Sequence, residues 1–341
     1  MASQPPIRVG VIGLGFIGRT HVAAFEAARR DGLSCRVVAV CDRQIGGGRG
    51  EPASANTIGG PGEAALGRDV ARHTDPAHVI DDPDIDLVSV CTYTDTHAPL
   101  AIRALHAGKH VLVEKPVALR AADIEPVARA ARETGRLCMP AFCMRFWPGW
   151  DWLKQQVASR AFGGVRSAVF QRLASRPAWS AEFYRDDDRT GGAICDLHIH
   201  DADVVRWLFG DPLSVNSAGS LDHITTLYRY GPGGPPHVVA EGGWDHAPGF
   251  AFRMRYLVVF DEATAEYDST RPSPLTLIRG GRAEEVPVAP HTGWEGEIRR
   301  LVETLAAGRT DPGASIDDAW ATARLLECER RSAETGAAVN L

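Results

Sequence analysis

An aspartate and a histidine four positions apart, Asp196 and His200, are the first pair in this sequence whose types and spacing suggest chemistry. Residues four apart in a helix share one face, so the carboxylate can orient the imidazole and stabilise its protonated form. Histidine titrates near neutral pH and therefore suits the movement of a hydroxyl proton. The pair predicts acid–base chemistry at an alcohol or carbonyl.

The same segment contains other possible metal ligands, so a metal site is the alternative to weigh; these are His198, Asp201 and Asp203. On a helix, His198 and His200 point roughly 160° apart and cannot readily chelate one ion. We therefore expect no metal here. His198 is expected to line a substrate pocket or to make a structural hydrogen bond.

A glycine-rich loop lies close to the N-terminus, between a predicted strand and a predicted helix. Gly13 permits a tight turn, Gly15 lets the backbone approach a pyrophosphate, and Gly18 allows close packing of helix on strand. Phe16 and Ile17 open the helix, whose free N–H groups attract phosphate. The pattern predicts a dinucleotide site.

An acidic residue ends the next predicted strand. Asp42 stands about 20 residues beyond the glycines, where a carboxylate binds ribose hydroxyls. Because it repels a 2′-phosphate, NAD is favoured over NADP. Arg43 could pair with that phosphate or stack on adenine, or it could be an exposed loop residue.

The elements that must position these residues alternate at first between strand and helix, which predicts a parallel α/β sheet in a Rossmann domain over residues 1–145. Expected strands are 8–12, 35–41, 87–91, 110–113 and 137–141, and expected helices are 17–29, 99–107 and 121–134. The glycine-rich stretch 46–62 is expected to form a surface loop.

Residues 146–341 have a different pattern, with strands separated by Gly/Pro turns, which predicts an α+β domain with an antiparallel sheet. One long helix is expected around 196–209. The tail 294–334 is expected to be helical, with a break near 308–312, and to return to the first domain.

Composition narrows the class of protein. A net charge of -6 gives no electrostatic signature of nucleic-acid or membrane binding. The seven cysteines include no CxxC pair, which favours free thiols in a reducing compartment. With no signal peptide or membrane span recognised, the expected location is the cytoplasm.

Together with the glycine loop, three segments resemble the Gfo/Idh/MocA family of oxidoreductases: residues 90–97, 108–116 and 191–203. The run 330–336 is also similar, so the resemblance spans nearly the whole chain. Two residues depart from the family pattern. Tyr93 stands where Pro, Asn or a small residue is usual, and His198 stands where Gly is more common.

The resemblance implies a Rossmann domain followed by an open, mainly antiparallel sheet, with the active site where the two meet. The outer sheet face often forms homo-oligomers in this family, so a dimer or tetramer is expected. Lys115, Asp196 and His200 match the family's catalytic residues. Further contacts are expected to the cofactor from Thr92, His97, Glu114 and Lys115, and to the substrate from Lys115, Arg145, Tyr184, His198 and His200.

The expected activity is hydride transfer between NAD(P) and a secondary hydroxyl of a sugar, glycoside or cyclitol. Two alternatives stay open. One is a redox-assisted lyase or glycosidase that keeps NAD bound. The other is an NAD-sensing regulatory protein without catalysis, which has no need of a proton relay.

Overall fold

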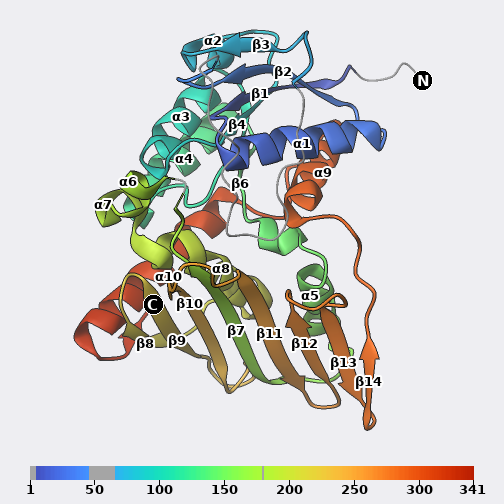
Figure 1. Ribbon diagram of the computed structural model, residues 1–341, viewed down its shortest axis with the longest axis vertical. Helices are drawn as coiled ribbons and strands as arrows, with labels where there is room; N and C mark the ends of the chain where they lie inside the picture. Colours follow the sequence, from blue (N-terminus) through green and yellow to red (C-terminus); the bar gives the residue numbers. More distant parts are fainter. Residues whose placement is uncertain (1–4, 46–65, 179) are drawn as a thin grey trace. The chain divides into compact units, whose positions relative to one another are not determined.

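The protein is described by a computed structural model that covers residues 5–45, 66–178 and 180–341. The predicted loop at 46–62 lies outside these residues. The chain forms two compact units (Figure 1). Unit 1 comprises the described residues up to Phe146 together with Thr292–Trp320, and unit 2 comprises Trp147–His291 and Ala321–Leu341.

Unit 1 contains a six-stranded parallel sheet in the order β3-β2-β1-β4-β5-β6, the strand order of a Rossmann fold. Its strands are β1 (Ile7–Ile12), β2 (Cys35–Cys41), β3 (Ala71–His73), β4 (Leu87–Val90), β5 (His110–Val113) and β6 (Cys138–Pro140). The helices between them are α1 (Phe16–Arg30), α2 (Ala77–Ile80), α3 (Thr94–His106) and α4 (Ala121–Thr134). The fold class predicted for this part is confirmed.

The central strands are apolar along their length because helices cover both faces of a parallel sheet. All four residues of β4 are buried, and β1 is buried from Val9 onward. The short elements β3 and α2 were not predicted. β3 has no apolar pattern, since its three residues are Ala, Arg and His and none is buried.

A C-terminal helix, α9 (Gly293–Ala306), belongs to unit 1 and packs on α1 (Figure 1). It starts with a capping box in which the Thr292 hydroxyl accepts from the Glu295 N–H and the Glu295 carboxylate accepts from the Thr292 N–H. Phe16 meets Trp294 edge-on at 6.3 Å between ring centres. Helix α9 also packs against η1 (Cys143–Phe146), a short 3₁₀ helix that follows β6.

Unit 2 contains a nine-stranded sheet in the order β14-β13-β12-β11-β7-β10-β9-β8-β15. Its pairs are antiparallel except for β7 with β10, which confirms the expected open, mainly antiparallel sheet. The strands are β7 (Val165–Ser175), β8 (Ser214–Gly219), β9 (His223–Arg229), β10 (Val238–His246), β11 (Arg253–Phe260), β12 (Thr264–Asp268), β13 (Leu275–Arg279), β14 (Arg282–Glu285) and β15 (Val339–Asn340).

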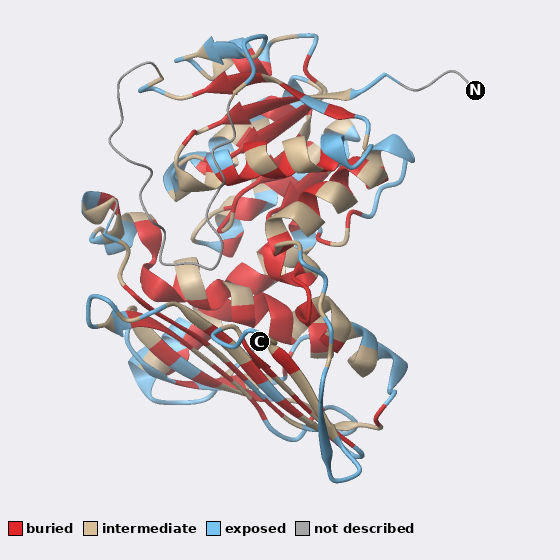
Figure 2. Ribbon diagram, turned by 45° about the vertical axis from the view of Figure 1, so that its right-hand side comes forward, coloured by how far each residue is buried: buried red, intermediate tan, exposed pale blue. Residues whose placement is uncertain are grey.

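Burial alternates along these strands because only one sheet face is covered by helices (Figure 2). In β10, Val238, Ala240, Gly242 and Trp244 are buried, whereas Glu241 and Asp245 are not. Unit 2 also has α5 (Trp150–Ser159), α6 (Ala181–Tyr184), α7 (Asp187–Thr190) and most of α10 (Ile316–Thr335). No helix among the described residues is long and apolar enough to cross a membrane.

The helix expected at 196–209 begins differently from its prediction. A π turn, η2 (Ile194–His198), leads directly into α8 (Ile199–Phe209). A π turn holds more than 3.6 residues, so the regular spacing assumed for Asp196 and His200 is wrong in detail. Both residues still lie at the start of one continuous helical segment.

Candidate dinucleotide and catalytic site

The three glycines of the loop have different structural reasons to be glycine. Gly13 has φ +93°, and a Cβ there would lie 2.4 Å from the Cys91 carbonyl oxygen. A Cβ on Gly18 would lie 1.8 Å from the Gly13 carbonyl oxygen. A Cβ on Gly15, by contrast, would meet no atom within 4 Å. The open space beside Gly15 fits the approach of a pyrophosphate.

The N-terminus of α1 adds the electrostatic part of this site. Gly15 is the N-cap and provides no side chain to bind the first-turn N–H groups, which begin at Phe16 and Ile17. The first turn of a helix carries the positive end of its dipole. The residues therefore fit a dinucleotide phosphate.

Asp42 is held beside the glycine loop by backbone N–H groups. One carboxylate oxygen accepts from Leu14 N–H at 2.8 Å and the other from Gln44 N–H at 2.9 Å. This fixes the acid at the end of β2, the position expected of a ribose-binding residue. Arg43, the next residue, is exposed.

Lys115 follows the end of β5 and is half-buried. Its backbone N–H donates to the Glu114 carboxylate at 3.1 Å. The next residue is held by His97, whose ring nitrogens lie 2.8 Å from the Pro116 carbonyl oxygen and 3.0 Å from that of Thr92. Burial lowers the pKa of His97. A neutral imidazole has one N–H, so the His97 ring can donate to one of these two carbonyl oxygens at a time. The ring lies between the turn that carries Lys115 and the end of β4.

Glu114 belongs to a buried cluster whose other members, His21, Ser89 and Glu297, were not predicted from the sequence. His21 of α1 lies with Nε2 3.0 Å from Glu114 Oε1 and Nδ1 2.9 Å from Ser89 Oγ. Glu297 of α9 approaches the same Nε2 at 3.7 Å. His21 and Glu297 have fully buried side chains, and no described residue makes a hydrogen bond to either Glu297 oxygen.

Burial and mutual contacts shift the pKa values of Glu297, His21 and Glu114 in this cluster. Burial raises the pKa of Glu297 well above its ordinary value, so this acid holds a proton. Burial opposes the charge of His21, but Cys91 and Glu114 outweigh it and raise the pKa of His21. Burial likewise opposes the charge of Glu114, but the His21 hydrogen bond prevails and lowers its pKa. By type His21, Glu114 and Glu297 could also hold a metal ion.

In unit 2, Asp196 and His200 are half-buried, whereas His198 is fully buried. His198 Nε2 lies 2.8 Å from Glu329 Oε2, and a Cβ on Gly242 would come within 2.8 Å of His198 Nδ1. Burial opposes the charge of His198, but Glu329 outweighs it and raises its pKa. The structure therefore favours the structural hydrogen bond over the substrate contact for His198.

Tyr184 lies at the end of α6 and is half-buried. Its ring meets Trp244 edge-on at 5.8 Å, and its carbonyl oxygen accepts from Arg176 at 3.1 Å. Arg176 also pairs with Asp222, which accepts from the Trp244 indole N–H. Sequence analysis did not single out Arg176, because its partners are remote in sequence. This network fixes the segment that carries Tyr184.

Comparisons with known proteins bear on both units. Residues 7–142 match the family described as "Oxidoreductase family, NAD-binding Rossmann fold", and residues 150–247 match the "GFO/IDH/MocA C-terminal domain". The scyllo-inositol 2-dehydrogenase (NAD(+)) of Bacillus subtilis is 32% identical over 263 residues, which are 71% of this chain and 74% of that protein. The chain belongs to the Gfo/Idh/MocA family.

Other similar proteins extend the match along the chain. An inositol 2-dehydrogenase of Acidothermus cellulolyticus is 28% identical over 359 aligned residues, covering 99% of this chain and 96% of that protein. A levoglucosan dehydrogenase solved with NADH and levoglucosan superposes with a TM-score of 0.80 at 22% identity, over 98% of this chain and 99% of that one. That similarity shows a shared fold. The predicted family and NAD-binding Rossmann domain are confirmed.

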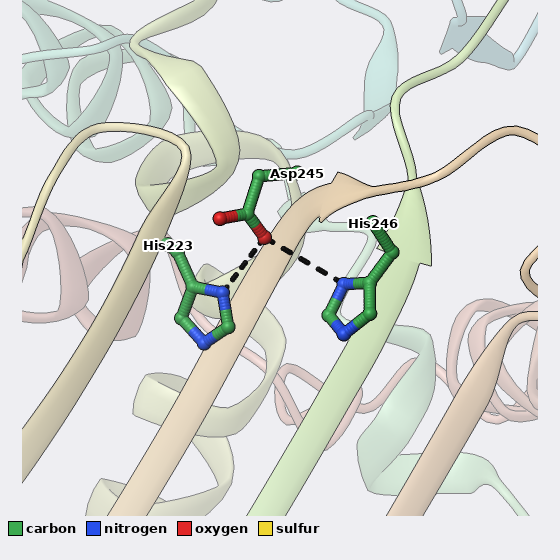
Figure 3. A group of neighbouring side chains, drawn as sticks. All are labelled: His223, Asp245 and His246. Atoms are coloured by element: carbon green, nitrogen blue, oxygen red, sulfur yellow. Dashed lines mark hydrogen bonds and ion pairs between the residues drawn. The ribbon is translucent and has the colours of Figure 1, made fainter.

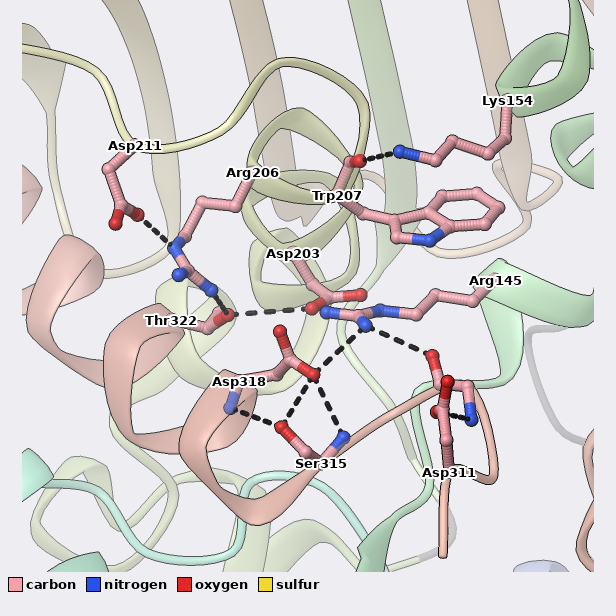
Figure 4. A network of polar contacts seen from close by, with 11 residues as sticks. Arg145, Lys154, Asp203, Arg206, Trp207, Asp211, Asp311, Ser315, Asp318 and Thr322 are labelled. Carbon is pink, nitrogen blue, oxygen red and sulfur yellow. Dashed lines mark hydrogen bonds and ion pairs between the residues drawn. The ribbon is translucent and has the colours of Figure 1, made fainter. Parts of the chain in front are cut away.

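One expected substrate residue of this Gfo/Idh/MocA protein, Arg145, makes several polar contacts within unit 1 (Figure 4). Arg145 is buried in unit 1, where it donates to the Gly313 carbonyl oxygen at 3.1 Å and to Asp318 at 3.2 Å. Burial opposes the charge of Asp318, but Arg145 and Ser315 prevail and lower its pKa. Arg145 thus forms a salt bridge within unit 1, and its contact with the substrate stays a prediction.

Within unit 1 the structure gathers the glycine loop, Asp42, Thr92, His97 and the Glu114–Lys115 pair at the carboxyl ends of neighbouring strands. Ligands bind at this edge in open α/β sheets. Within unit 2, Asp196 and His200 share the start of one helical segment. The catalytic residues predicted from the sequence are thus divided between the units.

Proposed function

We propose that this protein reversibly oxidises a secondary hydroxyl of a sugar, glycoside or cyclitol, with NAD as hydride acceptor. The observation that carries the proposal is Lys115, held at the strand end beside a glycine loop open at Gly15. Family membership and the inositol dehydrogenases among the relatives support the substrate class.

When bound, NAD would supply a nicotinamide ring that takes up the hydride. The loop at Gly13–Gly18 and the start of α1 would hold its pyrophosphate, and Asp42 its ribose hydroxyls. The Asp42 carboxylate favours NAD because it repels a 2′-phosphate. Arg43 is exposed, and the hydrogen bonds that hold the Asp42 carboxylate come from Leu14 and Gln44. We assign Arg43 to the adenine end of the cofactor. Thr92 is proposed to line the nicotinamide end.

In the proposed reaction, Lys115 donates a hydrogen bond to the reacting hydroxyl oxygen and stabilises negative charge that develops there. His200 accepts the hydroxyl proton, and Asp196 stabilises the imidazolium that forms. Tyr184 is proposed to contact the remaining hydroxyls. His97 and Glu114 are assigned a positioning role, because their side chains hold the turn that carries Lys115.

We also propose that the protein forms a homo-oligomer through the outer face of the sheet in unit 2. Leu257, Val169, Val239 and Leu227 lie side by side in register across four adjacent strands. Leu257 is 44% exposed and Val169 37% exposed. A continuous apolar row on an exposed face suits association with a second copy.

The direct test of activity is NADH absorbance over a panel of sugars, glycosides and inositols, with NAD and NADP compared. Steady NADH production with one polyol class supports the proposal. Turnover with tightly bound NAD and no added cofactor supports the lyase or glycosidase alternative. NAD binding without turnover on any substrate supports the sensor.

The role of Lys115 is tested by Lys115→Ala. We expect turnover to fall by a factor on the order of 10³, as for loss of a group that stabilises transition-state charge. NAD affinity, measured by calorimetry, is expected to stay within about threefold of wild type, because the pyrophosphate and ribose contacts are untouched. Loss of NAD binding instead would overturn the assigned role.

A further inference from the structure

Three potential metal ligands converge on the outer face of the unit 2 sheet (Figure 3). His223 Nδ1 lies 2.8 Å from Asp245 Oδ1, and His246 Nδ1 lies 3.6 Å from the same oxygen. All three side chains are partly accessible, with exposures of 29%, 51% and 24% for His223, Asp245 and His246. In the single chain, an ion can therefore reach them from solvent.

A β-bulge brings the three together. Asp245 and His246 both pair with Ser175, so the strand register shifts between them. Bulges re-aim side chains that would otherwise alternate between faces. Across the ladder, Gly243 pairs with His223, and a Cβ on Gly243 would lie 2.6 Å from His223 Nδ1. The absence of a side chain at Gly243 leaves room for this imidazole.

The ligand set suits a transition metal. Two imidazole nitrogens and one carboxylate oxygen are ligands typical of Zn²⁺. In a tetrahedral site with bonds of about 2.0–2.1 Å, ligand atoms lie about 3.3 Å apart, between the two distances observed. Small side-chain movements would therefore complete the site.

A second layer of contacts orients His223. Its other ring nitrogen, Nε2, lies 3.0 Å from Glu241 Oε1, and Gln171 donates to the second Glu241 oxygen. A carboxylate that holds the remote ring nitrogen of a metal-bound histidine is a common arrangement. It directs Nδ1 toward the proposed ion.

The alternative occupant is a proton, which would make His223 an imidazolium between two carboxylates. His246 argues for an ion. Its buried Nδ1 has no hydrogen-bond partner among the described residues, while its ring is held between His223 and Phe250 by stacking. A proton on His223 leaves that nitrogen unsatisfied, whereas a shared cation would bind it.

We propose that His223, Asp245 and His246 bind one Zn²⁺ ion, with water as the fourth ligand. The ion would link the start of β9 to the end of β10. This site is separate from the residues assigned to catalysis, because the neighbouring Gly242 faces His198 on the opposite side of the sheet. Its role is structural and does not depend on the proposed dehydrogenase activity.

The test uses the full chain without a histidine tag, stripped of metal by a chelator and titrated with Co²⁺ and then Zn²⁺. We expect one equivalent of Co²⁺ per chain, visible absorption bands of tetrahedral Co²⁺, and their loss when Zn²⁺ displaces it. Asp245→Asn and His246→Asn should abolish the bands. Glu241→Gln should weaken binding by about 10–100-fold.

The matched control is His237→Asn, which removes an exposed histidine next to β10 but outside the cluster. It should bind Co²⁺ as wild type does. Circular dichroism and NAD affinity of the metal-free variants should match wild type, which separates lost ligands from lost folding. Unchanged affinity in Asp245→Asn would overturn the proposal, as would thiolate-to-cobalt bands that place the metal on a cysteine.

Discussion

Glu297 shows how burial alone can set the charge of a residue. Its carboxyl group lies inside unit 1, and burial raises its pKa well above the ordinary value of 4.5. The folded protein therefore keeps a proton that the unfolded chain releases. The stabilisation is fully present below the unfolded pKa and is lost as pH rises toward the folded pKa, at about 1.4 kcal/mol per pH unit.

Glu297→Gln should remove this dependence, because a neutral amide replaces a neutral acid of similar size. As pH rises above 4.5, the ordinary pKa of glutamate, we expect the free energy of unfolding to fall less steeply in the variant than in wild type. Urea denaturation at several pH values measures the slope. Glu303→Gln, on the same helix but outside the cluster, is the control, and equal slopes in all three proteins would refute the assignment.

Residues whose roles depend on local sequence were predictable. Gly13, Gly15 and Gly18 were identified because a strand, a turn and a helix succeed one another within a few positions. Glu297 could not be identified, since its partner His21 lies at the other end of the chain. His21 itself left one signal, a polar residue on the buried face of α1 beside Val22 and Phe25.

The glycine loop and helix α1 together form the connection between β1 and β2. Substitutions of its glycines should separate effects on folding stability from effects on NAD affinity. Gly15→Ala adds a methyl group where nothing lies within 4 Å. We expect thermal stability to stay near wild type, whereas the Kd for NAD should rise at least about tenfold because the methyl occupies the pyrophosphate space.

Gly18→Ala is the companion variant. Its Cβ would lie 1.8 Å from the Gly13 carbonyl oxygen, so the protein itself should be destabilised. Calorimetric unfolding and NAD titration on both variants check the contrast. If Gly15→Ala binds NAD as wild type does, the pyrophosphate lies elsewhere.

Helix α8 is tied to the sheet by a buried ion pair. Arg172 of β7 donates to both Asp201 oxygens, at 2.8 and 3.2 Å, and both side chains are almost fully buried. Asp201→Asn leaves a buried cation without its counter-charge. We expect the free energy of unfolding to fall by about 3–5 kcal/mol in urea denaturation.

The control for Asp201 is Asp211→Asn, which breaks the more exposed pair with Arg206 shown in Figure 4. Such pairs contribute about 1 kcal/mol or less. If the two variants lose equal stability, the buried pair does not anchor α8.

The periodicity of apolar residues predicted the long helices. It did not predict the geometry of their first turns or the elements that pack against them. α1, α4, α9 and α10 were predicted because an apolar stripe or a run of helix formers extends over several turns. The π turn at Ile194–His198 leaves no such signal, because one extra residue in a turn does not change the pattern. α5 was not predicted, because only Trp150 and Leu153 of its ten residues are buried and the apolar stripe is therefore short.

At the scale of the molecule, the C-terminal segment is divided between the two units. α9 packs in unit 1, whereas α10 from Ala321 onward belongs to unit 2, where Glu329 meets His198 and Ser332 bonds Ser217. The sequence predicted that the whole tail returns to the first domain. The sequence pattern of an amphipathic helix predicts that one of its faces is buried, but it does not predict which unit that face packs against.

The apolar row on the outer sheet face predicts that the protein is an oligomer, which its molecular mass in solution will test. Leu257 pairs with Val169 near the middle of the sheet, so Leu257→Glu places a charge inside the proposed interface. We expect wild type to sediment as a dimer or tetramer and the variant to shift toward monomer, with unchanged circular dichroism. Leu213→Glu is the control, because Leu213 is 64% exposed and lies outside the row. A monomeric wild type, or a Leu257→Glu variant of wild-type mass, would show that a second copy does not cover this face.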